Sequence, residues 1–234
     1  MLRILMNYAK VNRLSKIHPI EKTILFLLPI VIIGFIKEST LIISLNILIM
    51  IMIHVLIKSP KTIILKFTSG ILIFSIFTSI SLIFDQGLEY ILILILKSIS
   101  GSLCILLFTI TTPIEDVLYF GAKHNWVSDM CDIAKNMIRF LILIEDEYLL
   151  LLNAVKSRHG FDTLTLRIKN SAKVMGILFI NTMRRWKELR EAVDSRGYTG
   201  KTVYLERKFD FSILRLLLEI SYSAILIVLI LILE

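Results

Sequence analysis

The sequence is poor in the residues that build disulfide frameworks and metal centres. Its 234 residues include only two cysteines, Cys104 in an apolar run and Cys131 near the start of a charged segment. Zinc sites and disulfide-rich domains need closely spaced ligand or cysteine pairs, and this chain lacks them. The histidines are equally scattered, at His18, His54, His124 and His159. We therefore expect no metal site and no other cofactor in this chain.

Motifs for phosphate chemistry and catalysis are also missing. No G-x-x-x-x-G-K-[ST] loop occurs, so the chain is not its own P-loop motor. The acidic run Glu145-Asp146-Glu147 offers carboxylates, but among Arg and Lys such residues more often form salt bridges or face solvent. No acid, base and nucleophile occur at a convincing spacing. We therefore expect that the protein is not an enzyme.

Apolar residues dominate what is present. The chain is 56% hydrophobic, with long runs of Ile and Leu, and is more apolar than the usual soluble domain. Stretches of about 20 apolar residues cross a bilayer as helices, because a helix satisfies its own backbone polar groups. The sequence thus predicts an all-α polytopic integral membrane protein with about five transmembrane helices. The expected spans are residues 23–36, 40–57, 67–84, 90–112 and 211–234.

Positive charges in the short connections predict the orientation of these spans. They lie before the first span and between the second and third, at Lys10, Arg13, Lys16, Lys22, Lys58, Lys61 and Lys66. The connection 85–89 carries no basic residue. Because Lys and Arg collect in cytoplasmic loops, we expect a cytoplasmic N-terminus. Within the fourth span, Lys97 suggests either a functional contact with another subunit or, as we favour, a snorkelling side chain or local polar contact.

Residues 114–210 differ from the rest and are expected to lie in the cytoplasm. From Lys156 to Lys208 alone, the excess of Lys and Arg over Asp and Glu equals the formal net charge of the whole chain, +8. Apolar residues recur every three or four positions from Met130 to Arg158 and predict one long amphipathic helix. A second helical stretch runs from about Leu166 to Arg196, with a bend at Gly176 as an alternative. We expect both to lie on or against the inner membrane face.

Both predicted helices end on the same short pattern, Ala154-Val-Lys-Ser-Arg-His-Gly160 and Ala192-Val-Asp-Ser-Arg-Gly197. An Arg complements the negative end of a helix dipole, and the Gly after it is a common cap, with Gly160 expected in the left-handed conformation. Either copy alone is explained in this way. A helix cap alone does not require the whole shared pattern Ala-Val-x-Ser-Arg. Its small residues let the end of a helix approach another surface closely, and its guanidinium can bind carboxylates or backbone carbonyls through two hydrogen bonds.

On these residues the chain resembles the T component of energy-coupling factor (ECF) transporters, whose two Ala-Arg-Gly signatures end the coupling helices. The matching signatures are Ser157, Arg158, His159 and Gly160, and Ser195, Arg196 and Gly197. The likeness extends to Asn12–Lys22 and Thr111–Pro113, and it is closest to the cobalt-type T component. The chain departs in two respects. Ser replaces the commoner Ala in both signatures, and His159 separates Arg158 from Gly160.

The resemblance implies a division of labour in the plasma membrane of a prokaryote. Two ABC ATPase subunits, identical or different, would bind ATP and move the tips at Arg158 and Arg196, and a separate membrane subunit would bind the substrate. Cobalt ion is the implied cargo, with nickel or a vitamin as alternatives. Two rivals of other classes are a membrane-embedded enzyme acting on lipid or nucleotide, and a nucleic-acid-binding membrane protein. The latter would need aromatic residues interleaved among the basic ones, so we expect no nucleic-acid partner.

Overall fold

Helices make up the regular structure of the chain, as the apolar periods of the sequence require. The structure is a computed structural model that describes residues 2–36, 39–124, 126–197 and 209–233. These residues contain no named strand, and the all-α prediction is confirmed. The elements are α1 (Leu2–Val11), η1 (Arg13–Lys16), α2 (Pro19–Phe35), α3 (Thr40–Leu56), α4 (Lys61–Thr111), α5 (Ile114–Ala122), α6 (Ser128–Lys156), α7 (Leu164–Asp194) and α8 (Ile213–Leu233).

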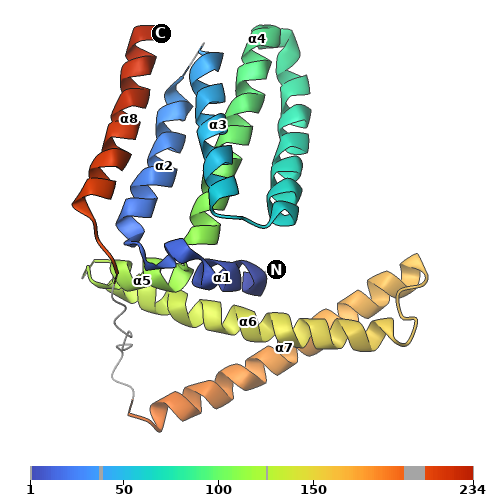
Figure 1. Cartoon of the computed structure of the whole chain (residues 1–234). Coiled ribbons are helices and arrows are strands. Elements are labelled where there is room, and N and C mark those ends of the chain that lie inside the picture. Colours follow the sequence, from blue (N-terminus) through green and yellow to red (C-terminus); the bar gives the residue numbers. More distant parts are fainter. Residues whose placement is uncertain (1, 37–38, 125, 198–208, 234) are drawn as a thin grey trace. The chain divides into compact units, whose positions relative to one another are not determined.

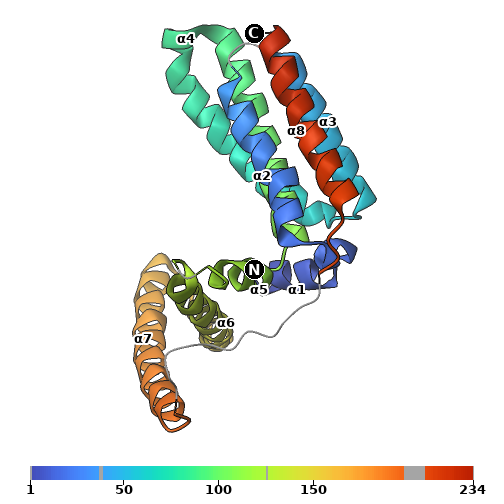
Figure 2. The same ribbon diagram turned by 90° about the vertical axis from the view of Figure 1, so that its left-hand side faces the viewer.

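The chain divides into two compact units. One comprises Met1–Val117 and Glu206–Glu234, and the other comprises Leu118–Leu205. The first unit is a bundle in which α2, α3, α8 and the two halves of α4 lie side by side (Figures 1 and 2). Part of the predicted cytoplasmic segment 114–210, residues 198–208, lies outside the described residues.

A break at one glycine turns the long helix α4 back on itself. Within its 51 residues, Gly87 has φ 79° and ψ 170°, a conformation that a residue without Cβ adopts at little cost. The break separates two antiparallel helices, Lys61–Leu82 and Gly87–Thr111. The predicted connection 85–89 therefore contains a sharp turn at Gly87. Each helix begins before its predicted span, at Lys61 and Gly87, and ends one or two residues before the predicted end.

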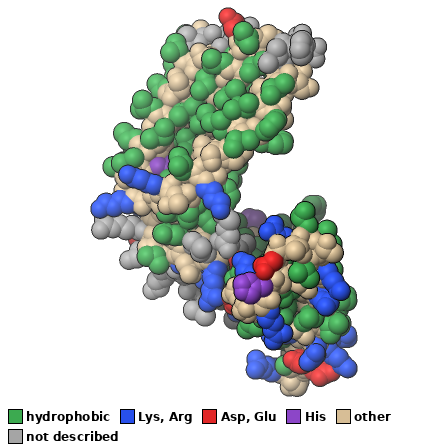
Figure 3. All heavy atoms as spheres, turned by 90° about the vertical axis from the view of Figure 1, so that its right-hand side faces the viewer, with side chains coloured by type: hydrophobic (Ala, Val, Ile, Leu, Met, Phe, Trp, Pro, Cys, Tyr) green, Lys and Arg blue, Asp and Glu red, His purple; other side chains and the backbone are tan. Residues whose placement is uncertain are grey.

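The bundle has the dimensions of a membrane-embedded unit. Lys61–Leu82, Gly87–Thr111 and Ile213–Ile232 are long and apolar enough to cross a bilayer. The shorter apolar helix α3 has 17 residues, the lower end of the usual range of about 17 to 25 for a spanning helix. The helix α2 also has 17 residues but carries Glu21 and Lys22 near its start. Three helices of the described residues thus meet the length of a span, and the expected number of about five stays a prediction. Hydrophobic side chains cover the face of the bundle in Figure 3. This surface is suited to lipid, and the protein is embedded in a membrane.

Two apolar clusters fill the interior of the bundle. One joins α2, α3, α4 and α8 around Ile33, Ile43 and Leu226, and the other joins α2, α3 and α4 around Phe26 and Met50. These side chains are buried. In a bilayer, burying these side chains stabilises the bundle mainly through close packing, because lipid chains are as apolar as the core. Packing of large side chains between the helices therefore holds the bundle together.

Polar contacts concentrate at one end of the bundle, where α1 lies across it (Figure 1). Glu21 is fully buried, and its carboxylate pairs with the Arg215 Nε at 3.1 Å and accepts the Ser212 N–H at 3.1 Å. The buried Lys22 donates its Nζ–H to the Thr111 carbonyl at 2.9 Å. These contacts fasten the start of α8 to α2 and the end of α4 to α2.

The second unit is built on two long helices, α6 and α7, that run in opposite directions and cross (Figure 1). The structure has α7 as one helix of 31 residues that continues through Gly176. The alternative of two shorter helices is therefore wrong. Both helices begin and end within two residues of the predicted bounds, because their apolar period and terminal glycine patterns mark the ends.

Candidate functional site

The first signature closes the end of α6. The His159 N–H donates to the Lys156 carbonyl at 3.1 Å, and the Gly160 N–H donates to the Val155 carbonyl at 3.0 Å. These are the two hydrogen bonds of a Schellman motif, in which the residue after the cap is left-handed. His159 is that residue, with a φ of 54°. Arg158 is therefore the last residue before the chain turns away, and we call residues 154–160 the first tip.

The second signature ends α7 with hydrogen bonds equivalent to those of the first as far as Gly197, and we call residues 192–197 the second tip. Gly197 is left-handed with a φ of 67°, and its N–H donates to the Asp194 carbonyl at 3.1 Å. The Arg196 N–H donates to the Val193 carbonyl at 3.2 Å, the length of the equivalent bond in the first tip. The two arginines thus hold the same position at the ends of two helices.

The serines of the two tips also make matching contacts. The Ser157 hydroxyl donates to the Ala154 carbonyl at 3.0 Å, and the Ser195 hydroxyl donates to the Ala192 carbonyl at 3.0 Å. Each serine bonds to its own helical turn, a local contact that competes with partners outside the helix. The repeated Ala-Val-x-Ser-Arg therefore produces a repeated structure.

The expected left-handed conformation of Gly160 is wrong, because His159 takes it. Gly160 is needed for space instead. A Cβ on Gly160 would lie 2.5 Å from Val155 Cγ1 and 2.9 Å from Asn170 Nδ2. The Asn170 amide donates its Nδ2–H to the Gly160 carbonyl at 2.7 Å, which joins the first tip to the start of α7.

The guanidinium groups of both tips are available to a partner. Arg158 and Arg196 are exposed, and neither guanidinium has an ion pair or hydrogen bond with another residue in the described parts of the chain. In contrast, Arg185 lies 3.7 Å from the Glu147 carboxylate. The tips therefore present two charges that the unit itself does not neutralise.

The two tips lie at opposite ends of α7 (Figure 1). This helix has 31 residues, and at about 1.5 Å per residue its length is ~46 Å. A partner that engages both tips must therefore offer two sockets a comparable distance apart.

An acidic residue joins α6 to α7 between the tips. The Glu147 carboxylate accepts the Asn181 Nδ2–H at 2.6 Å and lies 3.7 Å from the Arg185 guanidinium. Its role here is to hold two helices together, as expected for the run Glu145-Asp146-Glu147. Glu145 and Asp146 also have polar partners.

Two of the histidines make hydrogen bonds within the bundle. His54 Nδ1 lies 3.1 Å from the Ser59 hydroxyl, and His54 Nε2 lies 3.3 Å from the Leu103 carbonyl. His18 Nδ1 accepts the Ile20 N–H and caps α2. Over the described residues, the structure groups no three His, Cys, Asp or Glu side chains as metal ligands.

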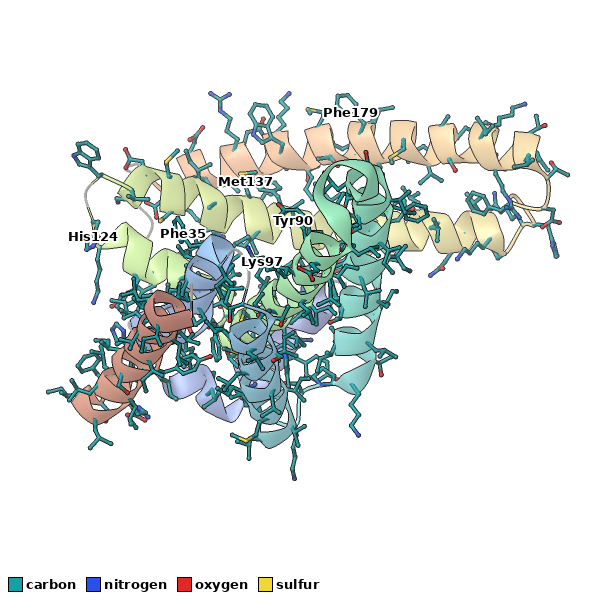
Figure 4. The ribbon with its side chains drawn as sticks, turned by 90° about the horizontal axis from the view of Figure 1, so that it is seen from above. Phe35, Tyr90, Lys97, His124, Met137 and Phe179 are labelled. Carbon is teal, nitrogen blue, oxygen red and sulfur yellow. The ribbon has the colours of Figure 1, made fainter. Side chains whose placement is uncertain are left out.

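Lys97 makes a local polar contact. Its Nζ–H donates to the Gly34 carbonyl at 3.1 Å. Gly34 lies in the last turn of α2, where carbonyls have no partner within the helix, and Figure 4 shows Lys97 on α4 near Phe35 at this helix end. The favoured interpretation of Lys97 from the sequence is therefore supported by this hydrogen bond.

Sequence reasoning missed the residues that support the first tip. Arg167 donates its Nε–H to the Phe161 carbonyl at 2.7 Å, and the Thr163 hydroxyl accepts the Leu166 N–H at 3.4 Å. The Thr163 cap was open to prediction, since Thr before a helix is a common start signal. The Asn170 contact to Gly160 was not, because it depends on how the connection between α6 and α7 folds.

Comparison with known proteins yields one family and one relative. The family described as CbiQ, cobalt transport protein, matches residues 10–205. An uncharacterized protein of Methanocaldococcus jannaschii is 25% identical over 147 residues, which are 63% of this chain and 55% of that protein. The match thus spans about half the length of that relative. The family match includes both tips and four of the apolar helices.

Proposed function

The chain belongs to the CbiQ family of cobalt transport proteins, and from this premise we propose that it is the energy-coupling (T) subunit of an ECF-type importer. In this role it transmits the ATP-driven motion of two cytoplasmic ATPase subunits to a separate membrane subunit that binds the substrate. The complex lies in a prokaryotic plasma membrane, with the N-terminus of this chain in the cytoplasm. Cobalt ion is the substrate that the family favours.

The observation that carries the proposal is the equivalence of the two tips. Arg158 and Arg196 each end a long helix, each lies one residue before a left-handed residue, and each guanidinium is exposed. A pair of related ATPases offers two similar grooves, and two matching tips fit that symmetry. An Arg that enters such a groove pairs with carboxylates or backbone carbonyls there.

The second partner needs a different surface, and the long helices supply one. Large apolar side chains are exposed on α6 and α7, among them Met137, Met175, Phe179 and Ile180. Phe179 points away from α6 in Figure 4. Exposed apolar patches of this kind mark protein or membrane contacts. We propose that these exposed apolar side chains contact the membrane face and the substrate-binding subunit.

Co-purification tests the ATPase contact. Tagged wild-type protein is expected to bring two ATPase subunits out of native membranes, and the Arg158→Ala, Arg196→Ala double variant to lose them. Truncating an interfacial Arg costs about 2 to 5 kcal/mol when the partner's charge is left buried. The matched control is Arg139→Ala, which removes an exposed arginine of α6 away from both tips. Equal recovery of ATPases by the double variant and the control would contradict the proposal.

Uptake of radioactive cobalt by cells that carry the full complex tests the transport role. Each single variant is expected to lower uptake, and the double variant to lower it further. Competition with unlabelled nickel or a vitamin identifies the cargo. A complex that takes up only a vitamin would retain the coupling role and overturn the assignment of cobalt.

A further inference from the structure

A groove lies at the end of the bundle, between α1 and the turn that joins α3 to α4. Its volume is about 460 Å³, within the range of about 300 to 1,000 Å³ found for small-molecule sites. Most of its wall is apolar. The lining includes Tyr8, Val11, Leu14, Leu56, Lys58 and Pro60.

Unpaired positive charge lies in the groove at Lys58 and continues into the start of α4. Lys58, Lys61 and Lys66 are exposed, and none has an ion pair or hydrogen bond through its ammonium group with another described residue. Lys10, at the same end, pairs with Glu115 at 2.9 Å. The first turn of α4 contains no acidic residue. Figure 3 shows basic side chains gathered at this end of the apolar bundle. The groove therefore suits an anionic group.

The backbone conformation of Lys58 favours a ligand-binding role for its side chain. Lys58 is left-handed with a φ of 54°. The turn is closed by the Lys58 N–H to the Val55 carbonyl and the Ser59 N–H to the His54 carbonyl, both at 3.1 Å. Glycine suits this position best, and such outliers cluster at ligand sites. A lysine here carries a backbone cost that its ammonium group can offset by binding a ligand.

The apolar wall of the groove continues onto the lipid-facing surface. Val11 is 85% exposed and Leu56 is 72% exposed. Next to Leu56 on α3, Met52 and Val55 are also exposed and apolar. These exposed apolar residues of α3 next to the groove suit a ligand with a long apolar chain. Basic sites between helices at the membrane surface bind acidic lipid head groups.

We propose that this groove binds an anionic phospholipid, with its phosphate at Lys58 and one acyl chain along α3. The groove holds the glycerophosphate end and the upper part of a chain, and the remaining chain lies against the exposed face of α3. This site belongs to the membrane unit and is separate from the two tips. It does not depend on the proposed coupling role.

Native mass spectrometry of the purified full chain tests the site. The protein is exchanged into detergent with equal amounts of phosphatidylglycerol and phosphatidylcholine of the same acyl chains. A lysine near a membrane surface contributes an attraction that corresponds to about a fivefold preference for an anionic lipid. The wild type is expected to retain phosphatidylglycerol in preference to phosphatidylcholine, and Lys58→Arg is expected to keep this preference. In Lys58→Gly the preference is expected to fall about fivefold.

Two further variants separate the groove from general surface charge. Lys66→Ala removes an exposed lysine of the same segment that does not line the groove, and it is expected to leave the preference unchanged. Val11→Trp enlarges a side chain of the groove wall and is expected to change lipid retention with all lysines in place. The proposal is overturned if the wild type retains both lipids equally, or if Lys66→Ala loses as much as Lys58→Gly. Because Lys58→Gly relieves a backbone cost, unfolding does not explain its loss.

Discussion

His159 in the first tip holds the backbone position that Gly197 holds in the second. Both residues directly follow the tip arginine, and their φ angles are 54° and 67°. The first tip accordingly has an imidazole beside its Arg, where the second has none. His159 Nδ1 lies 3.3 Å from the Asp162 carboxylate, and both side chains are largely exposed. The two tips are therefore equivalent in backbone up to the left-handed residue but different in side chains.

His159→Gly is expected to stabilise the protein. Left-handed backbone costs about 1 to 2 kcal/mol for a residue with a Cβ, while glycine adds about 0.5 to 1 kcal/mol of conformational entropy to the unfolded chain. The exposed ion pair with Asp162 contributes little. The net gain of up to about 1 kcal/mol raises the midpoint of thermal unfolding in detergent. Gly197→Ala should lower it, and a fall in both variants would contradict the equivalence of the two positions.

Gly160→Ala and Gly176→Ala are expected to act in opposite directions. The added methyl at Gly160 meets Val155 Cγ1 at 2.5 Å, whereas nothing lies within 4 Å of one at Gly176. Overpacking costs about 1 to 3 kcal/mol, and replacing an exposed helical glycine by alanine gains about 1 kcal/mol. Thermal unfolding of the two variants measures both effects. Equal midpoints would show that the first tip is not closely packed.

Arg215→Met is expected to destabilise the bundle strongly. It leaves the fully buried Glu21 carboxylate without the Arg215 Nε, which lies 3.1 Å away. Breaking a fully buried pair costs about 3 to 5 kcal/mol, and the 37% exposure of the Arg215 side chain places this variant at or below the lower end of that range. The Glu21→Met, Arg215→Met double variant should recover part of the loss, because the buried Glu21 carboxylate is removed together with its partner.

The exposed pair of Lys10 and Glu115 provides the control for this experiment. Its side chains are 41% and 51% exposed, so Lys10→Met should change stability by less than about 1 kcal/mol. Urea or thermal unfolding in one detergent compares all four proteins. A double variant as unstable as Arg215→Met would show that the pair contributes through packing and not through charge.

Lys97→Met is expected to lower stability modestly and to leave cobalt uptake intact. The substitution removes the hydrogen bond to the Gly34 carbonyl, and such bonds contribute about 0.5 to 1.5 kcal/mol. Uptake and thermal unfolding are measured on the same variant. Lost uptake at unchanged stability would instead support the other interpretation, a contact of Lys97 with the substrate-binding subunit.

Local patterns in the sequence predicted much of the fold and the position of the tips. Apolar runs marked the helices of the bundle, and the period of three and four residues marked α6 and α7. The repeated Ala-Val-x-Ser-Arg placed Arg158 and Arg196 at helix ends, because an Arg followed by Gly fits a helix terminus. The helix α1 (LRILMNYAKV) was missed, because its apolar residues form a run too short to span a bilayer and a polar stretch follows them.

Contacts between distant segments were beyond the sequence. Glu21 and Arg215 meet only because α2 and α8 pack side by side. The left-handed residue of the first tip was assigned to Gly160 because glycine usually takes that conformation. The structure assigns it to His159. The Gly160 N–H donates to the Val155 carbonyl, which places Gly160 one residue after the left-handed position, and the side chain of Val155 leaves no room for a Cβ on Gly160.

The unbroken helix α7 sets both the distance and the relative rotation of the two tips. Each residue adds about 1.5 Å of length and turns the end by about 100°. One residue inserted in the middle of α7 would therefore move Arg196 only slightly along the helix axis, but would point it away from its former direction. Exposed side chains along α7 can change without moving either arginine, but a change of one in the number of its residues rotates one arginine relative to the other.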